Sequence, residues 1–324
     1  MKKTFVLALI LITAASLFAM GAKEDADYSV LNPVKVRVAA LKGPTAMGMV
    51  KLMEDSGEGS VNGNSYEFTV VGAPTEITPM LVKGEVDIAA LPANLAAVIY
   101  NNTKGKVKVL AVNTLGVLYI CENGNSVSSI EDLKGKTIYS SGKGSSPEYA
   151  LDYILEQNGL SDLPIEWKSE HAECVAALLN DPDAVALLPQ PFATTAIMKN
   201  PSIRIALDLN KEWDKVSPES ALLTGVVVAR TEFVEKEGAA VEKFLEEYGK
   251  STAWVNENVA ESSLMIGNLG IVTAQVAEKA LPYCNIVCIT GPEMKERLSG
   301  YLEVLYNANA KSVGGVLPGE DFYY

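Results

Sequence analysis

Cysteine and histidine are scarce in this chain, and their scarcity excludes several kinds of site. The 324 residues include four cysteines and one histidine. Four cysteines are too few for a disulfide scaffold, and no pair has the spacing of a zinc site, so we expect no metal and no cofactor. Cys284 and Cys288 are close in sequence, but residues 285–290 have the pattern of a strand, which would hold the two Cα atoms too far apart for a disulfide. Buried thiols are therefore favoured over a bridge.

Catalytic signatures are also missing. No serine lies in a strained nucleophile-elbow motif, no cysteine–histidine signature is present, and no carboxylate pair is marked by its spacing. The single histidine, His171, precedes an expected helix, where a capping or cleft-wall position is favoured over a role as a general base. Contact between His171 and a ligand stays open. We therefore predict a protein that is not an enzyme.

A long apolar run occurs once, at Phe5–Phe18, after the positively charged start Met1-Lys2-Lys3. Ala19-Met20-Gly21 follows as a small-residue cleavage site, so residues 1–21 are expected to form a signal peptide that directs export to the periplasm or the cell exterior. The run is short for a membrane span, which leaves a retained membrane helix as the alternative. A methionine stands where a lipoprotein signal would place cysteine, and the first cysteine is Cys121, so no lipid attachment is expected.

Positive charge is in short supply, because 27 Lys and Arg face 40 Asp and Glu and give a net charge of −13. Loss of Lys2 and Lys3 with the signal peptide would change it by two, to −15. An acidic exported chain with a pI near 4.7 is not suited to nucleic acid or to anionic lipid surfaces. The remaining length of about 300 residues is enough for two lobes, and we expect a monomer.

Strand and helix patterns alternate along the chain. Strands are expected at 35–41, 67–71, 86–91, 107–112, 137–139, 165–168, 185–188, 203–207 and 223–229. Helices are expected at 45–54, capped by Thr45, at 76–82 and 95–100, from near Pro147, Glu173 and Ala193, and over most of 237–308. Because the strands are apolar runs, the pattern predicts an α/β fold whose sheet is largely parallel and covered on both faces.

The strand–helix rhythm starts again near Leu118, which predicts two similar units. We expect lobe 1 to comprise residues 22–115 and 222–324 and lobe 2 to comprise residues 116–221. Two extended crossings near 113–118 and 220–224 would join them. Ligands in such folds lie beyond the carboxyl ends of parallel strands. That rule selects five loops, at 42–47, 91–94, 113–114, 140–146 and 189–192.

The hydroxyl-rich loop Ser140–Ser146 is the most informative of the five. It follows an expected strand, and it ends where Ser146 would cap a helix whose first residue is Pro147. A strand that leads through such a loop to a helix N-terminus presents backbone N–H groups and hydroxyls to a small polar ligand. Ser141, Ser145 and Ser146 are therefore candidate ligand contacts, with ordinary capping as the alternative reading of the last two.

The other loops supply the remaining candidates, and each of these could instead serve only as a cap, a turn or packing. They are Thr45, Ala46 and Met47 after the first strand, Asn94 after the third, Asn113 at the first crossing, and Gln190 and Phe192 in the last loop. None of the four arginines lies in a candidate loop, and arginine is the usual partner of carboxylate, sulfonate or phosphate. This mixture favours a neutral, partly apolar or aromatic solute. Binding of an anion by helix N-termini and hydroxyls is the alternative.

Three segments resemble solute-binding proteins of ABC importers: DIAALPANLA at 87–96, EDLKGKTI at 131–138 and ALLPQPF at 186–192. The group they resemble is the nitrate/sulfonate/thiamine-precursor binding family, which has a type II periplasmic-binding fold. The resemblance implies a two-lobed protein that closes on a small organic solute and delivers it to an ABC permease in the membrane. An exported receptor for a membrane sensor is one alternative. An enzyme is the other, although the pyrimidine synthases of this fold depend on a cysteine-rich stretch that is absent here.

Overall fold

The computed structural model describes residues 32–324. The expected signal peptide, residues 1–21, lies outside the described residues, as do the first residues of lobe 1. In the described part of the chain, no helix is both long enough and apolar enough to cross a membrane.

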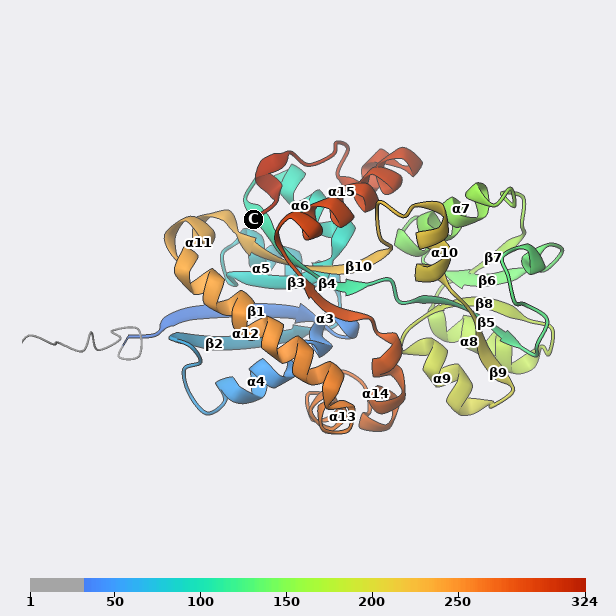
Figure 1. The fold of residues 1–324 in the computed structure, drawn as a ribbon, viewed down its shortest axis with the longest axis horizontal. Coiled ribbons are helices and arrows are strands. Elements are labelled where there is room, and N and C mark those ends of the chain that lie inside the picture. The colour runs from blue at the N-terminus through green and yellow to red at the C-terminus, as the bar shows by residue number, and fades with distance from the viewer. Residues whose placement is uncertain (1–31) are drawn as a thin grey trace, which may run out of the picture.

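Six strands form one mixed sheet in the order β11-β4-β10-β3-β1-β2 (Figure 1). They are β1 (Val34–Leu41), β2 (Asn64–Val71), β3 (Ile88–Pro92), β4 (Val107–Leu115), β10 (Leu223–Arg230) and β11 (Ile286–Ile289). β1 pairs in parallel with β2 and β3. β10 lies antiparallel between β3 and β4, and β11 pairs antiparallel with β4.

Five strands form a second sheet in the order β7-β6-β8-β5-β9. They are β5 (Leu118–Asn123), β6 (Ile138–Ser141), β7 (Ile165–Lys168), β8 (Val185–Pro189) and β9 (Ile203–Asp208). β6 pairs in parallel with β7 and β8, whereas β5 pairs antiparallel with β8 and β9. The α/β prediction is confirmed, and the two sheets give the two-lobed architecture that the type II fold implies.

The prediction of largely parallel sheets is wrong, because both sheets contain antiparallel strands at the places where the chain changes lobe. The chain leaves the six-stranded sheet at the end of β4 and returns beside that end, with Leu223 opposite Leu115. A strand that re-enters at the carboxyl end of its neighbours must run against them, as β10 does. β5 enters the second sheet in the same reversed sense, and this strand was not expected from the sequence.

Helices cover both faces of the six-stranded sheet, as predicted. Against one face lie α5 (Pro74–Val82), α6 (Ala93–Thr103) and α15 (Gly291–Ala308), and their buried residues form a cluster with sheet residues such as Val226 and Val228. Against the other lie α3 (Pro44–Met47), α4 (Val50–Ser56), α11 (Thr231–Lys236), α12 (Gly238–Glu257), α13 (Val259–Asn268) and α14 (Ala274–Ala280). Val227 points to this second group, which is the alternation that a strand buried on both faces requires.

Helices also flank the five-stranded sheet. They are α7 (Ser146–Gln157), α8 (His171–Asn180), α9 (Phe192–Lys199) and α10 (Leu209–Val216), with a short 3₁₀ turn at Glu131–Leu133. Further 3₁₀ turns lie at Leu281–Tyr283, Ala310–Val313 and Glu320–Phe322. The apolar cluster around Trp213 and α7 is continuous with the cluster around α15, so the lobes share part of their core. All four cysteines are free thiols, and Cys284 and Cys288 are not bridged.

The expected helix at 45–54 is instead two helices, α3 and α4, separated at Gly48 and Met49. A Cβ on Gly48 would lie 2.8 Å from the Ile286 side chain, so close packing at the break requires glycine. Thr45 does not cap this helix. It lies inside α3, and its buried hydroxyl donates to the Leu41 carbonyl at 3.0 Å.

The two crossings between the sheets lie side by side. The Gly116 N–H donates to the Leu222 carbonyl at 2.7 Å, and the Gly116 carbonyl accepts from Asn210 (2.6 Å) and Asn285 (2.7 Å). A Cβ on Gly116 would lie 2.5 Å from both the Asn210 Oδ1 and the Leu222 Cγ. The crossings therefore pack against each other too closely for any side chain at this position. The exact lobe boundaries at 22–115, 116–221 and 222–324 stay a prediction.

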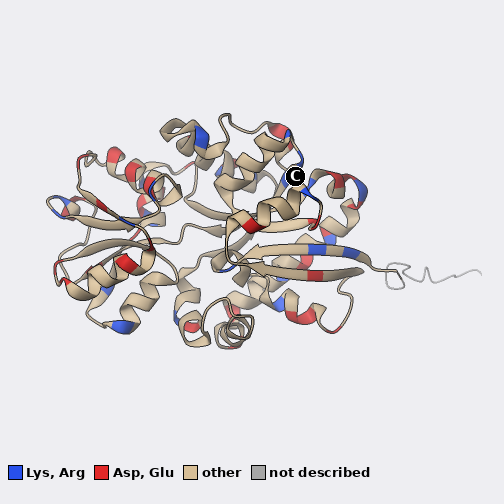
Figure 2. Ribbon diagram, turned by 180° about the vertical axis from the view of Figure 1, so that it is seen from behind, with Lys and Arg blue, Asp and Glu red and all other residues tan. Residues whose placement is uncertain are grey.

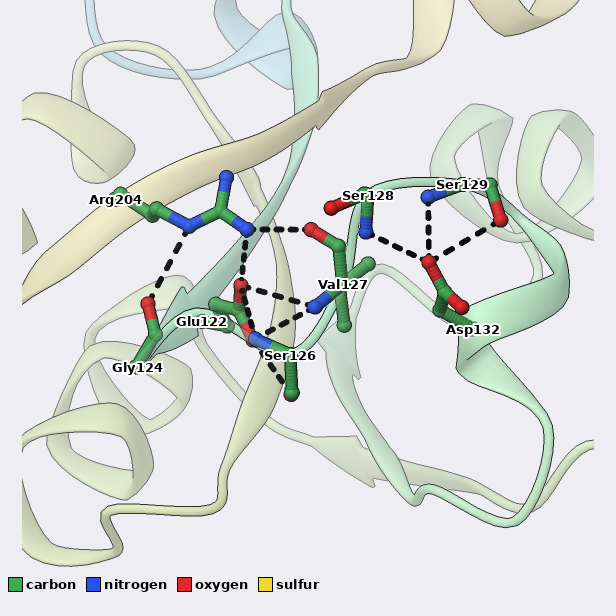
Figure 3. A network of polar contacts seen from close by, with 8 residues as sticks. All are labelled: Glu122, Gly124, Ser126, Val127, Ser128, Ser129, Asp132 and Arg204. Atoms are coloured by element: carbon green, nitrogen blue, oxygen red, sulfur yellow. Dashed lines mark hydrogen bonds and ion pairs between the residues drawn. The ribbon is translucent and has the colours of Figure 1, made fainter.

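Polar contacts around β5 fix the segment that carries the EDLKGK motif (Figure 3). The Glu122 carboxylate is 2% exposed, and it accepts N–H bonds from Ser126 and Val127 and pairs with Arg204 at 2.5 Å. Asp132 of the motif accepts N–H bonds from residues 128 and 129, each at 2.9 Å. Asp132 of the motif thus fixes the loop that precedes it.

Candidate solute-binding cleft

A cavity of about 550 Å³ lies where the two lobes meet. The six-stranded lobe contributes Pro74, Pro92, Asn94, Leu95, Leu222, Leu223, Thr224 and Tyr301 to its wall. The five-stranded lobe contributes Leu118, Ser145, Ser146, Pro147, His171 and Pro189. Gly116 and Val117 of the first crossing complete the wall. Pro92 and Pro189 end strands β3 and β8, so the cavity lies beyond the carboxyl ends of strands in both sheets. A ligand in this cavity would contact both lobes.

The start of α7 contributes two of the predicted residues, Ser145 and Ser146. Helix α7 begins at Ser146, so the N-cap residue is Ser145 and the expectation that Ser146 caps is wrong by one position. The Ser145 hydroxyl does not bond to the first turn, because it donates back to the Gly142 carbonyl. The α7 N-terminus is therefore left without a side-chain cap at the cavity wall.

Asn94 also lines the cavity, but it does not cap α6. That helix begins at Ala93 and has Pro92 as its N-cap residue, with no side-chain cap. The Asn94 amide donates to the Ser312 carbonyl at 3.2 Å, which ties α6 to the C-terminal segment. Its place in the cavity wall keeps it a candidate for solute contact.

Four predicted residues lie in the interior of the six-stranded lobe, apart from the cavity wall. Thr45, Ala46 and Met47 are buried in α3, and the Asn113 amide donates to the Thr45 carbonyl at 3.0 Å. The Asn113 side-chain oxygen Oδ1 accepts from the Thr114 hydroxyl. In this structure these contacts hold α3 on the end of β4, and a role in solute contact stays a prediction.

The last three predicted residues lie directly behind the wall of the five-stranded lobe. The Ser141 hydroxyl oxygen is 2.5 Å from His171 Nδ1, and the Phe192 ring packs 5.0 Å from the His171 ring. The Gln190 side-chain oxygen Oε1 accepts from the Thr194 hydroxyl at 2.8 Å, while the buried Nε2 of Gln190 has no partner in the described part of the chain. The three residues support the cavity wall at His171 and Pro189.

His171 is the first residue of α8 and belongs to the cavity wall. Burial lowers the pKa of its imidazole, so the ring is neutral near pH 7. A neutral ring bonded through Nδ1 to Ser141 leaves Nε2 as its second polar atom. The wall therefore gains a polar group without a fixed charge.

Tyr301 is the functional candidate that sequence reasoning missed. It lies on α15 and is 1% exposed, and its hydroxyl has no hydrogen-bond partner among the described residues. Burial raises the pKa of Tyr301 to about 12, and the neighbouring Ser146 hydroxyl opposes that shift. The group is thus a neutral donor. In the sequence it sits among Met294, Leu298 and Leu305 of an apolar helical stripe, which looks like ordinary core packing.

No lysine, arginine, aspartate or glutamate lines this cavity. The four arginines are paired with carboxylates elsewhere: Arg37 and Arg230 with Asp87 at 2.6 and 2.9 Å, Arg204 with Glu122 at 2.5 Å, and Arg297 with Glu293 at 2.9 Å. Figure 2 shows charged residues spread over the outer helices of both lobes. A second hollow of about 520 Å³ between α7 and α15 has the opposite character, because Asp152, Glu156, Glu219 and Glu303 line it.

Comparison with known proteins decides the family. Residues 59–279 match the family model described as the periplasmic substrate-binding protein of a phosphonate ABC transporter. The chain belongs to this family. Its members are the substrate-binding components of ABC importers, which bind small solutes outside the cytoplasm and work with a membrane permease. The sequence-based prediction of an ABC solute-binding protein is confirmed.

Solved structures agree with this assignment. A structure of an ABC transporter protein from Parabacteroides distasonis is 26% identical, with a TM-score of 0.76 over 90% of this chain and 99% of that one. The aliphatic sulphonate-binding protein SsuA from Escherichia coli is 16% identical, with a TM-score of 0.68 over 89% and 92%. The alkanesulfonate-binding protein SsuA from Xanthomonas axonopodis pv. citri is 14% identical, with a TM-score of 0.62 over 90% and 99%. The last two show the fold alone. A search of curated proteins finds no match.

Proposed function

We propose that this member of the family captures a small organic solute in the cavity between its lobes and releases it to the permease. The observation that supports this most is the cavity itself, because residues of both lobes line it at the ends of β3 and β8. Lobe 1 would comprise residues 22–115 and 222–324, and lobe 2 residues 116–221. We further propose that the mature chain is a monomer without lipid, follows a signal peptide cleaved near Gly21, and binds no nucleic acid.

We also propose that the chain binds its solute without chemical turnover. The contact between Ser141 and His171 is the arrangement closest to a catalytic pair at this site. Ser141 does not line the cavity, so its hydroxyl is not presented to a substrate carbonyl there. No carboxylate is hydrogen-bonded to the His171 ring among the described contacts, so the third group of a triad is absent there.

A thermal-melt assay tests the proposed function. Small molecules extracted from the source cells are separated into fractions and added to the purified mature chain. A fraction that contains the solute at about a hundred times its dissociation constant should stabilise the fold by about 2.7 kcal/mol. Mass spectrometry of that fraction before and after incubation should show the solute unchanged. The proposal fails if no fraction raises the melting temperature, or if the stabilising compound is consumed.

A further inference from the structure

The polar side chains of the cavity wall are all neutral, and they can donate hydrogen bonds. Tyr301 lines the wall and has a buried hydroxyl that lies beside the Ser146 hydroxyl, and Ser146 begins a helix that lacks a side-chain cap. A compact oxygen acceptor on a solute could satisfy both. The rest of the wall is largely proline, leucine and valine, so the body of the solute would lie in an apolar environment. Such an environment disfavours any charge that lacks a nearby partner.

No lysine or arginine lines the cavity, and three of the four helix N-termini at its wall have a glutamate in the first turn. Helix α5, whose Pro74 lines the wall, has Glu76 in its first turn, and this carboxylate accepts the Ala73 N–H at 2.9 Å. Glu148 in the first turn of α7 accepts the Gly144 N–H. Glu173 in the first turn of α8 accepts the Ser169 N–H at 3.0 Å.

Each of these glutamates offsets the partial positive charge of the helix end that it occupies. Only α6, which begins at Ala93, has an open first turn without an acidic residue. An anionic solute would therefore meet no lysine or arginine in the wall, and at three of the four helix ends a glutamate would offset the partial positive charge. One helix end does not balance a sulfonate, and still less a phosphonate carrying two charges.

We propose that the cavity takes an uncharged, largely apolar organic solute that accepts a hydrogen bond, and that it discriminates against phosphonates and sulfonates with the same body. This inference rests on the proposed function, because it assumes that the solute occupies this cavity. It separates the chain from the solute class named in the description of its family model. Tyr301 and Ser146 would hold the acceptor atom, one from each lobe.

A pair of fluorescent probes that differ by one sulfonate tests the charge preference directly. N-phenyl-1-naphthylamine is uncharged, and 1-anilinonaphthalene-8-sulfonate carries one negative charge on the same aromatic body. Titration of the mature chain should give a dissociation constant at least about tenfold lower for the uncharged probe, which corresponds to about 1.4 kcal/mol. Equal or tighter binding of the sulfonate, or binding of neither probe, overturns the proposal.

Two substitutions at Thr224 test whether the uncharged probe binds in this cavity and whether the charge preference of the cavity can be reversed. Thr224 lines the wall and is only partly buried, so it tolerates a larger side chain better than the core positions beside it. Thr224→Trp fills the space and should weaken the uncharged probe by about tenfold or more. Thr224→Lys supplies the missing cation and should shift the preference toward the sulfonate. If Thr224→Trp leaves binding of the uncharged probe unchanged, the probe binds elsewhere and the assignment to this cavity is wrong.

The glutamates at the helix ends provide an independent test. Glu148→Gln combined with Glu173→Gln should strengthen binding of the sulfonate probe severalfold, since two neighbouring negative charges are removed. Glu261→Gln is the matched control, because Glu261 also lies in the first turn of a helix, α13, but no residue of α13 lines the cavity. An equal effect in the control and the double variant would contradict a local role for these carboxylates.

Separation of the cell extract on an anion-exchange column distinguishes failure of this inference from failure of the proposed function. The stabilising compound should pass through the column with the uncharged fraction. If it is retained and elutes with salt, the solute is an anion, and the inference fails while the proposed function stands. If neither fraction stabilises the chain, the proposed function itself fails, and the inference fails with it.

Discussion

Tyr301 and Tyr248 are both fully buried and both have hydroxyls without a partner among the described residues, but only Tyr301 lines the cavity. Tyr301→Phe removes one donor to the solute and should weaken affinity by about 0.5–1.5 kcal/mol, measured by titration calorimetry with the stabilising fraction. Without solute the melting temperature should change little, because Tyr301 loses just its contact with the neighbouring Ser146 hydroxyl. Tyr248→Phe is the control and should leave affinity unchanged. Loss of stability in Tyr301→Phe at unchanged affinity would indicate a purely structural tyrosine.

Ser145 and Ser146 are adjacent but have different contacts, so alanine substitutions at the two positions should have different effects on stability and affinity. The Ser145 hydroxyl is used inside the loop by the Gly142 carbonyl, and Ser145→Ala should therefore lower stability by about 0.5–1.5 kcal/mol. The Ser146 hydroxyl lies beside Tyr301, and Ser146→Ala should lower affinity by a similar amount with little loss of stability. Urea melts and calorimetric titrations of both variants decide this. The opposite assignment of the two effects would contradict the geometry.

Glu122 should make the stability of the second lobe depend on pH. Burial by itself would raise the pKa of this carboxyl, but N–H bonds from Ser126 and Val127 and the charge of Arg204 outweigh it and lower the pKa below the usual 4.5. The folded state then binds the proton less readily than the unfolded state. Its contribution is fully present above pH 4.5 and is lost as the pH falls from there through the folded-state pKa.

Glu122→Gln should therefore lower the free energy of unfolding by about 2 kcal/mol or more at pH 7, and by progressively less below pH 4.5. Urea unfolding at pH 7 and below pH 4.5 measures the difference. Glu67→Gln is the control, because Glu67 forms a surface pair with Lys35 in which both side chains are about 60% exposed. Its effect should stay below about 1 kcal/mol. A Glu122 effect that did not change with pH would mean that the carboxylate charge is unimportant.

At the level of single residues, the sequence could place polar groups near the cleft but could not show which of them face it. Asn94, Ser145 and Ser146 lie in the cavity wall, whereas Asn113 and Thr45 follow the same strand-end rule and bond to each other in the interior. Loop position is set by local pattern, but side-chain direction depends on packing between distant elements. Tyr301 illustrates the second case, because α15 is held at the cavity by packing against distant elements such as α7, β4 and α6.

Among the elements, the paired crossings carry the most specific geometric requirement. Gly116→Ala would place a Cβ 2.5 Å from two neighbouring atoms and force the crossing segments apart. We expect a loss of about 1–3 kcal/mol of stability, measured by urea unfolding, together with weaker solute binding. Gly249→Ala in α12 is the control, because the nearest atom to a Cβ there is 3.9 Å away. If Gly116→Ala were as mild as the control, the crossings would be free to separate.

Regular elements were predictable where an apolar run lay between turn signals. The pattern placed β7 at 165–168 and β1 and β8 to within a residue at each end. The buried strand β8 is a continuous apolar run, whereas the edge strand β7 alternates apolar and charged residues. The direction of β10 was not predictable, since an apolar run is the same whichever way it is inserted. The break between α3 and α4 was also missed, because the tight packing of Gly48 there is against the distant Ile286.

For the whole molecule, the motifs identified the family although some of them serve structure. The aspartate of EDLKGK fixes a loop, and DIAALPANLA forms β3 and the start of α6 at the cavity edge. Fold and family could be predicted from these segments because packing constrains their residues whichever solute the protein binds. The solute could not, because it depends on a few wall residues contributed by segments as distant as Pro74 and Tyr301.

Closure around the solute is the property that needs both lobes together. If the solute lies between them, each lobe alone makes only part of its contacts, and the closed form is stabilised by ligand binding. Small-angle scattering should then show a smaller radius of gyration with the stabilising fraction than without it. Asn94→Ala in the six-stranded lobe and Ser146→Ala in the five-stranded lobe should each weaken binding, by about 0.5–1.5 kcal/mol. An unchanged radius at saturation, with only one of the two variants affected, would place the site on a single lobe and contradict binding between the lobes. An unchanged radius with both variants affected would instead mean a cleft that is already closed before the solute binds.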